Sequence, residues 1–502
     1  MKIIKHILFI FIGLNIVSCS DYIDNEITGE QNLDTYYSNY TESNKAVLGC
    51  YASLSPQDWW QTDFFWLVGD ICSDDAFKGN TNEGDQRDFG NLADFNITSS
   101  NEWLDSKWRY TYQGIFRTNL AITRIPEAPI EEEEINALVA EAKFLRAVFY
   151  FELVKNWGGV PLLTEPISVS EANLERATEE EVWALIESDL NDALDYLPLK
   201  SQQASTDKGR ATKGAAIAYL AKAALYQKNY TEAQSLANEV ITSGEYNLND
   251  AFKDVWSVAN PNGSGSIFEI QNSYSDLYDT GNALPVLSRS RADGGWGFGT
   301  PSSNLDNFMA GDPRRDFTII KQGDYVNEEY PSYDTKPSEN MTGRINRKYF
   351  LNSEDRPEKS EHKRSPLNHI LFRYADLLLM HAEAAYYNGD ENSALISLNK
   401  VRARVDLDDI SATGQGLLTA IYNERRMELA MEGHRYYDLK RTDRLTEAMA
   451  AFSNYNLNES TDEYDAGNDE GKYYKAEIHS LFPIPISEIN LSQGRITQNP
   501  GY

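Results

Sequence analysis

Cysteine and histidine are scarce in this chain of 502 residues, with three and six copies respectively. Three cysteines cannot build a disulfide framework. A single bridge between Cys50 and Cys72 is left open, but we expect both to be buried free thiols. The histidines show no HExxH or similar ligand spacing, and GxSxG and CxxC motifs do not occur. We therefore expect no metal, no cofactor and no catalytic residues.

Positive charge is also under-represented. The chain carries 46 Lys and Arg against 77 Asp and Glu, which gives a net charge of −31. A nucleic-acid partner requires a basic surface that displaces counterions from phosphates, and no basic cluster here outweighs its acidic surroundings. Nucleic acid is therefore not expected as a partner, and a neutral ligand fits better.

Long hydrophobic runs are absent. The run near the start, Ile7–Ile12, is far shorter than the roughly 20 residues that a membrane-spanning helix needs. It follows Lys2 and Lys5 and precedes small residues and Cys19, an order typical of a cleaved secretion signal over residues 1–18.

The end of this signal, Ile16-Val17-Ser18-Cys19, resembles the lipobox of bacterial lipoproteins, in which diacylglycerol is attached to the cysteine. We expect lipid on Cys19 to anchor the chain in the outer membrane, because several buried acyl chains bind stably. An ordinary export signal is the alternative. Residues 19–32 would form a tether, whose acidic residues resemble the tag for display on the cell exterior or belong to a plain solvated linker.

Helical repeats dominate the rest of the chain. Residues 212–243 and 374–405 each contain two helical runs with a polar break between them, and residues of the first segment match residues 161 positions later in the second. The matching positions are Ala221 with Ala382, Ala224 with Ala385, Tyr226 with Tyr387, Ala233 with Ala394 and Val240 with Val401. This pattern resembles tetratricopeptide units. A third candidate is residues 140–156 followed, after an insertion, by 179–197, and a fourth begins near Gly416. We therefore predict a mainly α fold built on a helix-pair scaffold.

Two motifs are interpreted as structural. Gly158, Gly159 and Pro161 follow Trp157 and should end a helix, because glycine permits unusual dihedrals and proline forbids continuation. Residues 424–441 mix Arg, Glu and aromatics at helical spacing, which predicts a packed, charge-laced helix and not a binding site.

Two segments lack helical periodicity. Residues 56–110 and 250–350 are rich in Trp, Tyr, Gly, Asn and Asp, and five of the nine tryptophans lie between positions 59 and 108. We predict long irregular loops with minor β structure. Function is expected there, because irregular segments on a rigid scaffold commonly carry binding sites.

Open aromatic rings in these segments are the candidate ligand-binding groups. A sugar presents an apolar C–H face ringed by hydroxyls, so an exposed ring that covers this face contributes about 1 kcal/mol. Trp59, Trp60 and Trp296 are the predicted platforms, whereas Trp66 and Trp108 should be buried. The predicted polar and phenolic partners are Asp58, Asp74, Asp75, Asp85 and Arg87 in the first segment, and Tyr274, Tyr278 and Arg291 in the second.

Several blocks, in order, resemble the SusD/RagB family of outer-membrane nutrient-binding lipoproteins. They include FLRAVFYFELVKNWGGVPL (144–162), GGWGFGTPSSNLDNFMAGDPR (294–314), FRYADLLLMHAEA (372–384), ERRMELAMEGHRYYDLKR (424–441) and the C-terminal LFPIPISEINLSQGRITQNPGY. The resemblance covers nearly the whole chain. It implies a lid-like protein seated on a TonB-dependent, SusC-like transporter, with oligosaccharide as ligand, or peptide in some members. It divides the chain into 33–245, an irregular ligand-binding insertion at 246–350, and 351–502.

We therefore expect a non-catalytic surface lipoprotein that binds oligosaccharide for nutrient uptake. Three alternatives stay open. The first is a peptide-binding importer subunit of the same family. The second is a surface glycoside hydrolase, since that activity requires only two carboxylates about 5 to 9.5 Å apart. The third is a protein that braces a transporter complex and binds no ligand.

Overall fold

The computed structural model describes most of the chain. The described residues are 36–55, 59–80, 82, 84–167, 175–275, 280–335, 342–358, 363–462, 465, 467, 468 and 470–502, with only the backbone of 59–62. The predicted leader, the tether and the lipidation of Cys19 lie outside these residues. The described part is mostly helical with few strands, which confirms the predicted fold class. Among its helices, none combines the length and apolar character that a membrane crossing requires.

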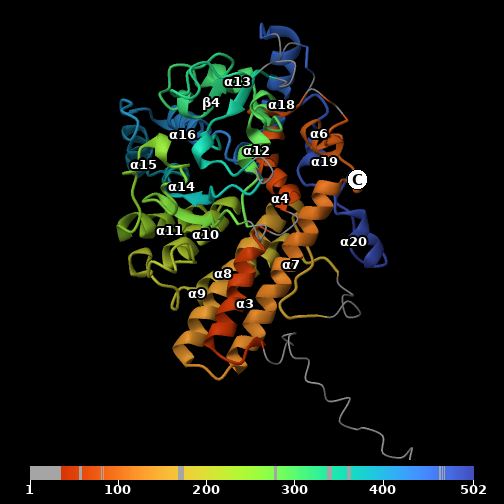
Figure 1. Ribbon diagram of the computed structural model, residues 1–502, viewed down its shortest axis with the longest axis vertical. Helices are drawn as coiled ribbons and strands as arrows, with labels where there is room; N and C mark the ends of the chain where they lie inside the picture. Colours follow the sequence, from red (N-terminus) through yellow and green to blue (C-terminus); the bar gives the residue numbers. More distant parts are fainter. Residues whose placement is uncertain are drawn as a thin grey trace, which may run out of the picture.

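Four helices pack side by side in the lower half of the molecule (Figure 1). They are α3 (Tyr40–Ala52), α7 (Glu102–Arg124), α8 (Glu132–Trp157) and α9 (Glu179–Ala193). A capping box formed by Glu131 and Glu134 starts α8, because each side chain binds an otherwise unpaired backbone amide. The helix ends at Gly158, whose φ is +69°. Both the α8–α9 unit and the predicted helix end are confirmed.

Two further helix pairs stack on this bundle. They are α10 (Lys213–Tyr226) with α11 (Tyr230–Ser243), and α14 (Tyr374–Tyr387) with α15 (Glu391–Ala403). The pairs pack through α11 and α14, and the rings of Tyr230 and Tyr387 stack with centroids 4.1 Å apart. The last unit, α16 (Gly414–Leu429), packs on α14 and α15. The predicted tetratricopeptide-like scaffold is therefore present.

The insertion is irregular, as predicted, and strands tie it to other parts of the chain. Three two-stranded antiparallel sheets pair β1 (Ala76–Gly79) with β3 (Phe298–Pro301), β2 (Ser266–Ile270) with β6 (His369–Arg373), and β4 (Ile319–Lys321) with β5 (Arg344–Asn346). The short helices α12 (Leu284–Ser288) and α13 (Ser303–Phe308) lie between β2 and β4. Figure 1 shows α13 and β4 at the top of the molecule, away from the long-helix bundle.

The prediction of long loops over 56–110 is wrong for most of that segment. It contains α4 (Trp59–Trp66), α5 (Val68–Ile71), β1, α6 (Arg87–Ala93) and the start of α7. Its aromatic rings fill the core: the ring of Phe64 lies 4.8 Å from that of Trp103 and 4.8 Å from that of Phe298. Helices this short show no clear period in the sequence, so their composition resembles that of a loop. Trp108 is buried as predicted, but Trp66 is only partly buried.

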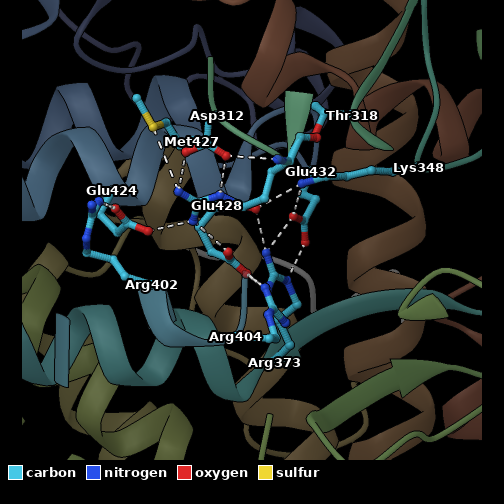
Figure 2. A network of polar contacts seen from close by, with 11 residues as sticks. Asp312, Thr318, Lys348, Arg373, Arg402, Arg404, Glu424, Met427, Glu428 and Glu432 are labelled. Carbon is cyan, nitrogen blue, oxygen red and sulfur yellow. Dashed lines mark hydrogen bonds and ion pairs between the residues drawn. The ribbon is translucent and has the colours of Figure 1, made fainter. Parts of the chain in front are cut away.

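Buried charges hold the C-terminal helices against the insertion (Figure 2). Three guanidiniums surround the fully buried carboxylate of Glu428, and they belong to Arg314, Arg373 and Arg404. The predicted helix 424–441 is two helices, since α16 ends at Leu429 and α17 covers Arg435–Arg441. Its packed, charge-laced character is confirmed.

The remaining C-terminal helices are short. They are α18 (Leu445–Asn454), α19 (Ala476–His479) and α20 (Ile486–Leu491). Cys50 and Cys72 are both buried and unbridged, which confirms the predicted free thiols.

Candidate ligand-binding site

Three segments that are distant in sequence meet at the predicted ligand-binding region. Gly79, the last residue of β1, pairs with Phe298, the first residue of β3, so the residues after β1 lie beside those before β3. An isolated bridge between Asn282 and Ser365 adds a third segment. Helix α4 packs on α12, and α12 leads into the residues before β3. The two segments that the sequence singled out are therefore adjacent in space.

Asp85 and Arg291 form the polar centre of this surface. Their carboxylate and guanidinium approach to 2.6 Å, and the side chains remain 32% and 36% exposed. The Arg291 Nε also donates to the main-chain oxygen of Trp296 at 3.0 Å. The Asn80 side-chain amide donates to the Asp85 carboxylate, and the Lys78 ammonium donates to the Asp85 main-chain oxygen at 2.9 Å. Three predicted residues, Asp85, Arg291 and Trp296, are thus brought together.

The Trp296 indole is held on a tight glycine turn. Its main-chain N–H donates to the Val286 oxygen at 2.8 Å. A methyl group at Gly295 would lie 2.2 Å from the Arg289 main-chain oxygen, so only glycine allows this close approach. The indole is partly buried, and the Lys363 ammonium lies 5.9 Å from its ring centroid. The turn therefore keeps part of the ring at the surface.

A buried carboxyl group links α4 to the start of α12. The Asp63 Oδ2 accepts a hydrogen bond from the Ala283 main-chain N–H at 2.7 Å. Burial raises the pKa of Asp63 to about 7, and the bond from Ala283 only partly offsets that rise. The backbone places Trp59 and Trp60 in the first turn of α4. Asp63 thus joins the helix that carries both tryptophans to α12, and the Val286 oxygen of α12 accepts from the Trp296 N–H.

Two of the predicted site residues are exposed at the surface. Tyr274 is 41% exposed, and Arg87 is exposed at the start of α6. Asp58, Tyr278 and the side chains of Trp59 and Trp60 lie outside the described residues.

The prediction that Asp74 and Asp75 contact the ligand is wrong, because both side chains are buried. The Asp75 carboxylate is fully buried and lies 2.8 Å from the Arg426 guanidinium, while that of Asp74 lies 2.7 Å from Arg435. Burial alone would raise the pKa of Asp74, but the guanidiniums of Arg426 and Arg435 hold it well below its usual value. These acids tie β1 to the C-terminal helices, so we remove them from the candidate binding set.

Two residues at this surface were not predicted from the sequence. Lys363 lies near the Trp296 ring, and Arg364 donates to the Ser275 main-chain oxygen at 3.2 Å. Both come from the segment that the Asn282–Ser365 bridge brings in. They occupy no recognisable motif, so no signal in the sequence could have identified them.

The arrangement suits the recognition of a hydroxylic ligand. A partly open indole offers an apolar face, and the carboxylate and guanidinium beside it offer an acceptor and several donors. Within the described ranges, no group of three His, Cys, Asp or Glu side chains could hold a metal ion.

The fold and this surface define a helical-repeat scaffold protein that carries an aromatic and polar surface on an irregular insertion. Two family models match the chain: one described as the SusD family covers residues 226–502, and one described as starch-binding associating with outer membrane covers 64–225. The chain belongs to the SusD family. The resemblance found in the sequence is confirmed.

Individual relatives match this chain over most of its length. A laminarin-binding SusD-like protein of known structure is 31% identical, with a TM-score of 0.78, and the match covers 93% of this chain and 100% of that one. Surface glycan-binding protein A from Bacteroides fluxus is 26% identical, with a TM-score of 0.77 and coverage of 93% and 100%. A SusD-like protein from Formosa agariphila is 28% identical over 493 residues, 89% of this chain and 94% of the relative.

Proposed function

We propose that this chain is a non-catalytic surface lipoprotein that binds oligosaccharide and delivers it to a TonB-dependent, SusC-like outer-membrane transporter. The observation that carries the proposal is the convergence of Trp296, Arg291 and Asp85 on one partly exposed surface. An indole face beside an ion pair matches the apolar face and hydroxyl ring of a sugar. Similarity to a laminarin-binding and a surface glycan-binding protein supports the same ligand class.

Binding by such a surface should be weak for each sugar unit. One ring that covers a sugar face contributes about 1 kcal/mol, and the loss of translational freedom on association offsets part of the total. Trp59, Trp60 and Tyr274 are the further rings we propose as contacts, with Arg87 and Tyr278 on the same segments. Several weak contacts along an oligosaccharide suit a protein that must release its ligand to a channel.

Native affinity electrophoresis against a panel of polysaccharides tests the ligand class. We expect one glycan to retard the purified chain and Trp296→Ala to abolish most of the retardation. The matched control is Tyr196→Ala, which removes a 50% exposed ring outside this surface. Retardation that is equal in the chain and in Trp296→Ala would contradict the proposed site.

The alternatives give different results in the same preparations. No retardation by any glycan, together with saturable peptide binding, would favour the peptide importer. New reducing ends released at catalytic rates would show a glycoside hydrolase. Binding to the transporter without any ligand would support a bracing role.

The anchor and the transporter partnership need tests in cells. We expect Cys19→Ser to lose incorporated fatty acid and to leave the membrane fraction. The wild-type chain should co-purify with an outer-membrane transporter after mild detergent extraction. An unacylated wild-type chain, or isolation without any transporter, would contradict this part of the proposal.

A further inference from the structure

A polar cavity of about 50 Å³ lies where the N-terminal bundle, the scaffold and the C-terminal helices meet. Its wall is formed by residues of α4, α8, α10, β6 and α17 and by the turn at Glu432–His434. Neither Trp296 nor its polar neighbours line it. Trp66, Gly433 and His434 in the wall are only partly buried, which leaves a route from solvent.

Positive charge exceeds negative charge around one carboxylate of the wall, Glu152, although only one of its two lysines, Lys155, lines the cavity. Glu152 is shared by two lysines, with its oxygens 2.6 Å from the Lys155 ammonium and 3.2 Å from the Lys107 ammonium. All three side chains are at most 13% exposed, so solvent does little to screen them. This group therefore holds one net positive charge inside a chain whose overall charge is −31.

The other ionisable groups of the wall do not supply the missing negative charge. Lys222 lies 3.2 Å from Asp376, but that carboxylate also binds Arg425. Glu432 is engaged by Arg373 and Lys348 (the Glu432 side of this network is drawn in Figure 2).

Both histidines of the wall are uncharged at neutral pH. Burial lowers the pKa of His369 to about 3 and that of His434 to about 4. The two neutral rings add no charge, so they leave the excess positive charge around Glu152 unchanged.

Two nitrogens in the wall lack a hydrogen-bond partner among the described residues. The Trp66 Nε1 and the His369 Nδ1 are buried, and neither has a hydrogen-bond partner in the part of the chain that the structure describes. Their rings lie 4.9 Å apart, so both nitrogens belong to the same region of the wall. An indole N–H can only donate, so the Trp66 Nε1 needs an acceptor that the described residues do not supply.

We propose that this cavity binds a small monovalent anion, such as chloride or a short carboxylate, held by the Lys155 and Lys222 ammoniums and the Trp66 N–H. The anion balances the charge left by two lysines on one carboxylate and supplies the acceptor that the indole lacks. Water would supply the acceptor but not the charge, and uncompensated buried charge is costly. A divalent anion would reverse the imbalance instead of removing it.

Thermal unfolding in exchanged sodium salts tests the site on the purified chain. Chloride or acetate is added against gluconate at constant ionic strength, which separates specific binding from screening. We expect the melting temperature to rise saturably with chloride or acetate, as it does for any ligand of the native state. An equal melting temperature in all salts would overturn the proposal.

Two variants connect the effect to the cavity. Lys155→Met leaves Glu152 paired with Lys107 alone and should abolish the anion dependence. Trp66→Phe removes one donor and keeps a ring, so the apparent affinity should fall about fivefold. The matched control is Trp183→Phe. The Trp183 N–H donates to Glu179 at 3.2 Å and the residue does not line the cavity, so its loss should leave the anion dependence unchanged.

Crystals grown in bromide locate the anion directly and do not depend on either variant folding. We expect an anomalous peak within hydrogen-bond distance of the Lys155 Nζ and the Trp66 Nε1. Bromide found only at other sites, or an anion dependence that survives both variants, would refute the proposal. None of these readouts involves a glycan, so they are separate from the test of the proposed function.

Discussion

The Asp85 carboxylate and the Arg291 guanidinium lie 2.6 Å apart although 206 positions separate them. Arg291 also binds the main-chain oxygen of Trp296, so the pair couples the residues after β1 to the turn that carries the indole. Both side chains are about one third exposed, and an exposed pair of this kind contributes roughly 0 to 1 kcal/mol to stability. Its main role in our proposal is to orient donors and acceptors beside the ring.

We expect Asp85→Asn and Arg291→Gln each to weaken glycan binding about tenfold, because hydrogen bonds to charged groups contribute roughly 1.5 to 3 kcal/mol. The double variant should lose less than the sum, since the two groups act together. Isothermal titration with the glycan that retards the chain measures all three. Asp254→Asn, which changes an exposed ion pair with Lys253, is the control. Unchanged affinity in all three variants would remove the pair from the site.

Gly295→Ala should weaken glycan binding by displacing the Trp296 turn, because the new methyl would meet the Arg289 main-chain oxygen at 2.2 Å. We expect loss of retardation in affinity gels with the fold retained by circular dichroism. Gly49→Ala is the control: its methyl would meet no atom within 4 Å, and alanine favours the helix there by roughly 0.5 to 1 kcal/mol. A Gly295→Ala chain that binds normally would show that the turn does not set the position of the indole.

Asp63→Asn should stabilise the chain in a pH-dependent way. The native pKa of Asp63 is about 7, above the roughly 3.9 of an unfolded chain. Between these two pKa values the native state binds more protons than the unfolded state. The stability contributed by the protonated acid is therefore lost as pH rises from about 4 to 7, by at most about 1.4 kcal/mol per pH unit. Asparagine does not ionise. The advantage of the variant in urea unfolding should therefore grow from pH 4 to pH 7 and then level off; an advantage independent of pH would contradict this account.

Glu428→Gln should destabilise the chain by about 3 to 5 kcal/mol, since it leaves several buried guanidiniums short of a counter-charge. The pKa of Glu428 is held well below its usual value because neighbouring Arg404, Arg373 and Arg314 outweigh the effect of burial. Urea unfolding followed by circular dichroism measures the loss. Glu239→Gln, at an exposed position of α11, should change the free energy of unfolding by less than about 0.5 kcal/mol. Similar values for both variants would show that the network in Figure 2 is not needed for stability.

The scaffold could be predicted because its signals are local. Alanines such as Ala221 and Ala382 recur at helical spacing where paired helices cross, and both are fully buried. The short helices α4 to α6 gave no comparable signal, since eight residues or fewer contain about two turns. Asp75 was assigned to the binding surface from its polar neighbours. Its burial depends on Arg426, 351 positions away, which no local pattern reveals.

The sequence by itself determined the helix pairs and the family, because helical periodicity, turn glycines and motif order act over a few neighbouring residues. It also singled out the segments in which we propose that the ligand-binding residues lie. Tertiary structure decided which polar side chains of those segments meet. Asp85, Arg291 and Lys363 come from three parts of the chain that only strand pairing brings together. A salt bridge or an open ring depends on what packs beside it, and that is settled only when distant segments fold against one another.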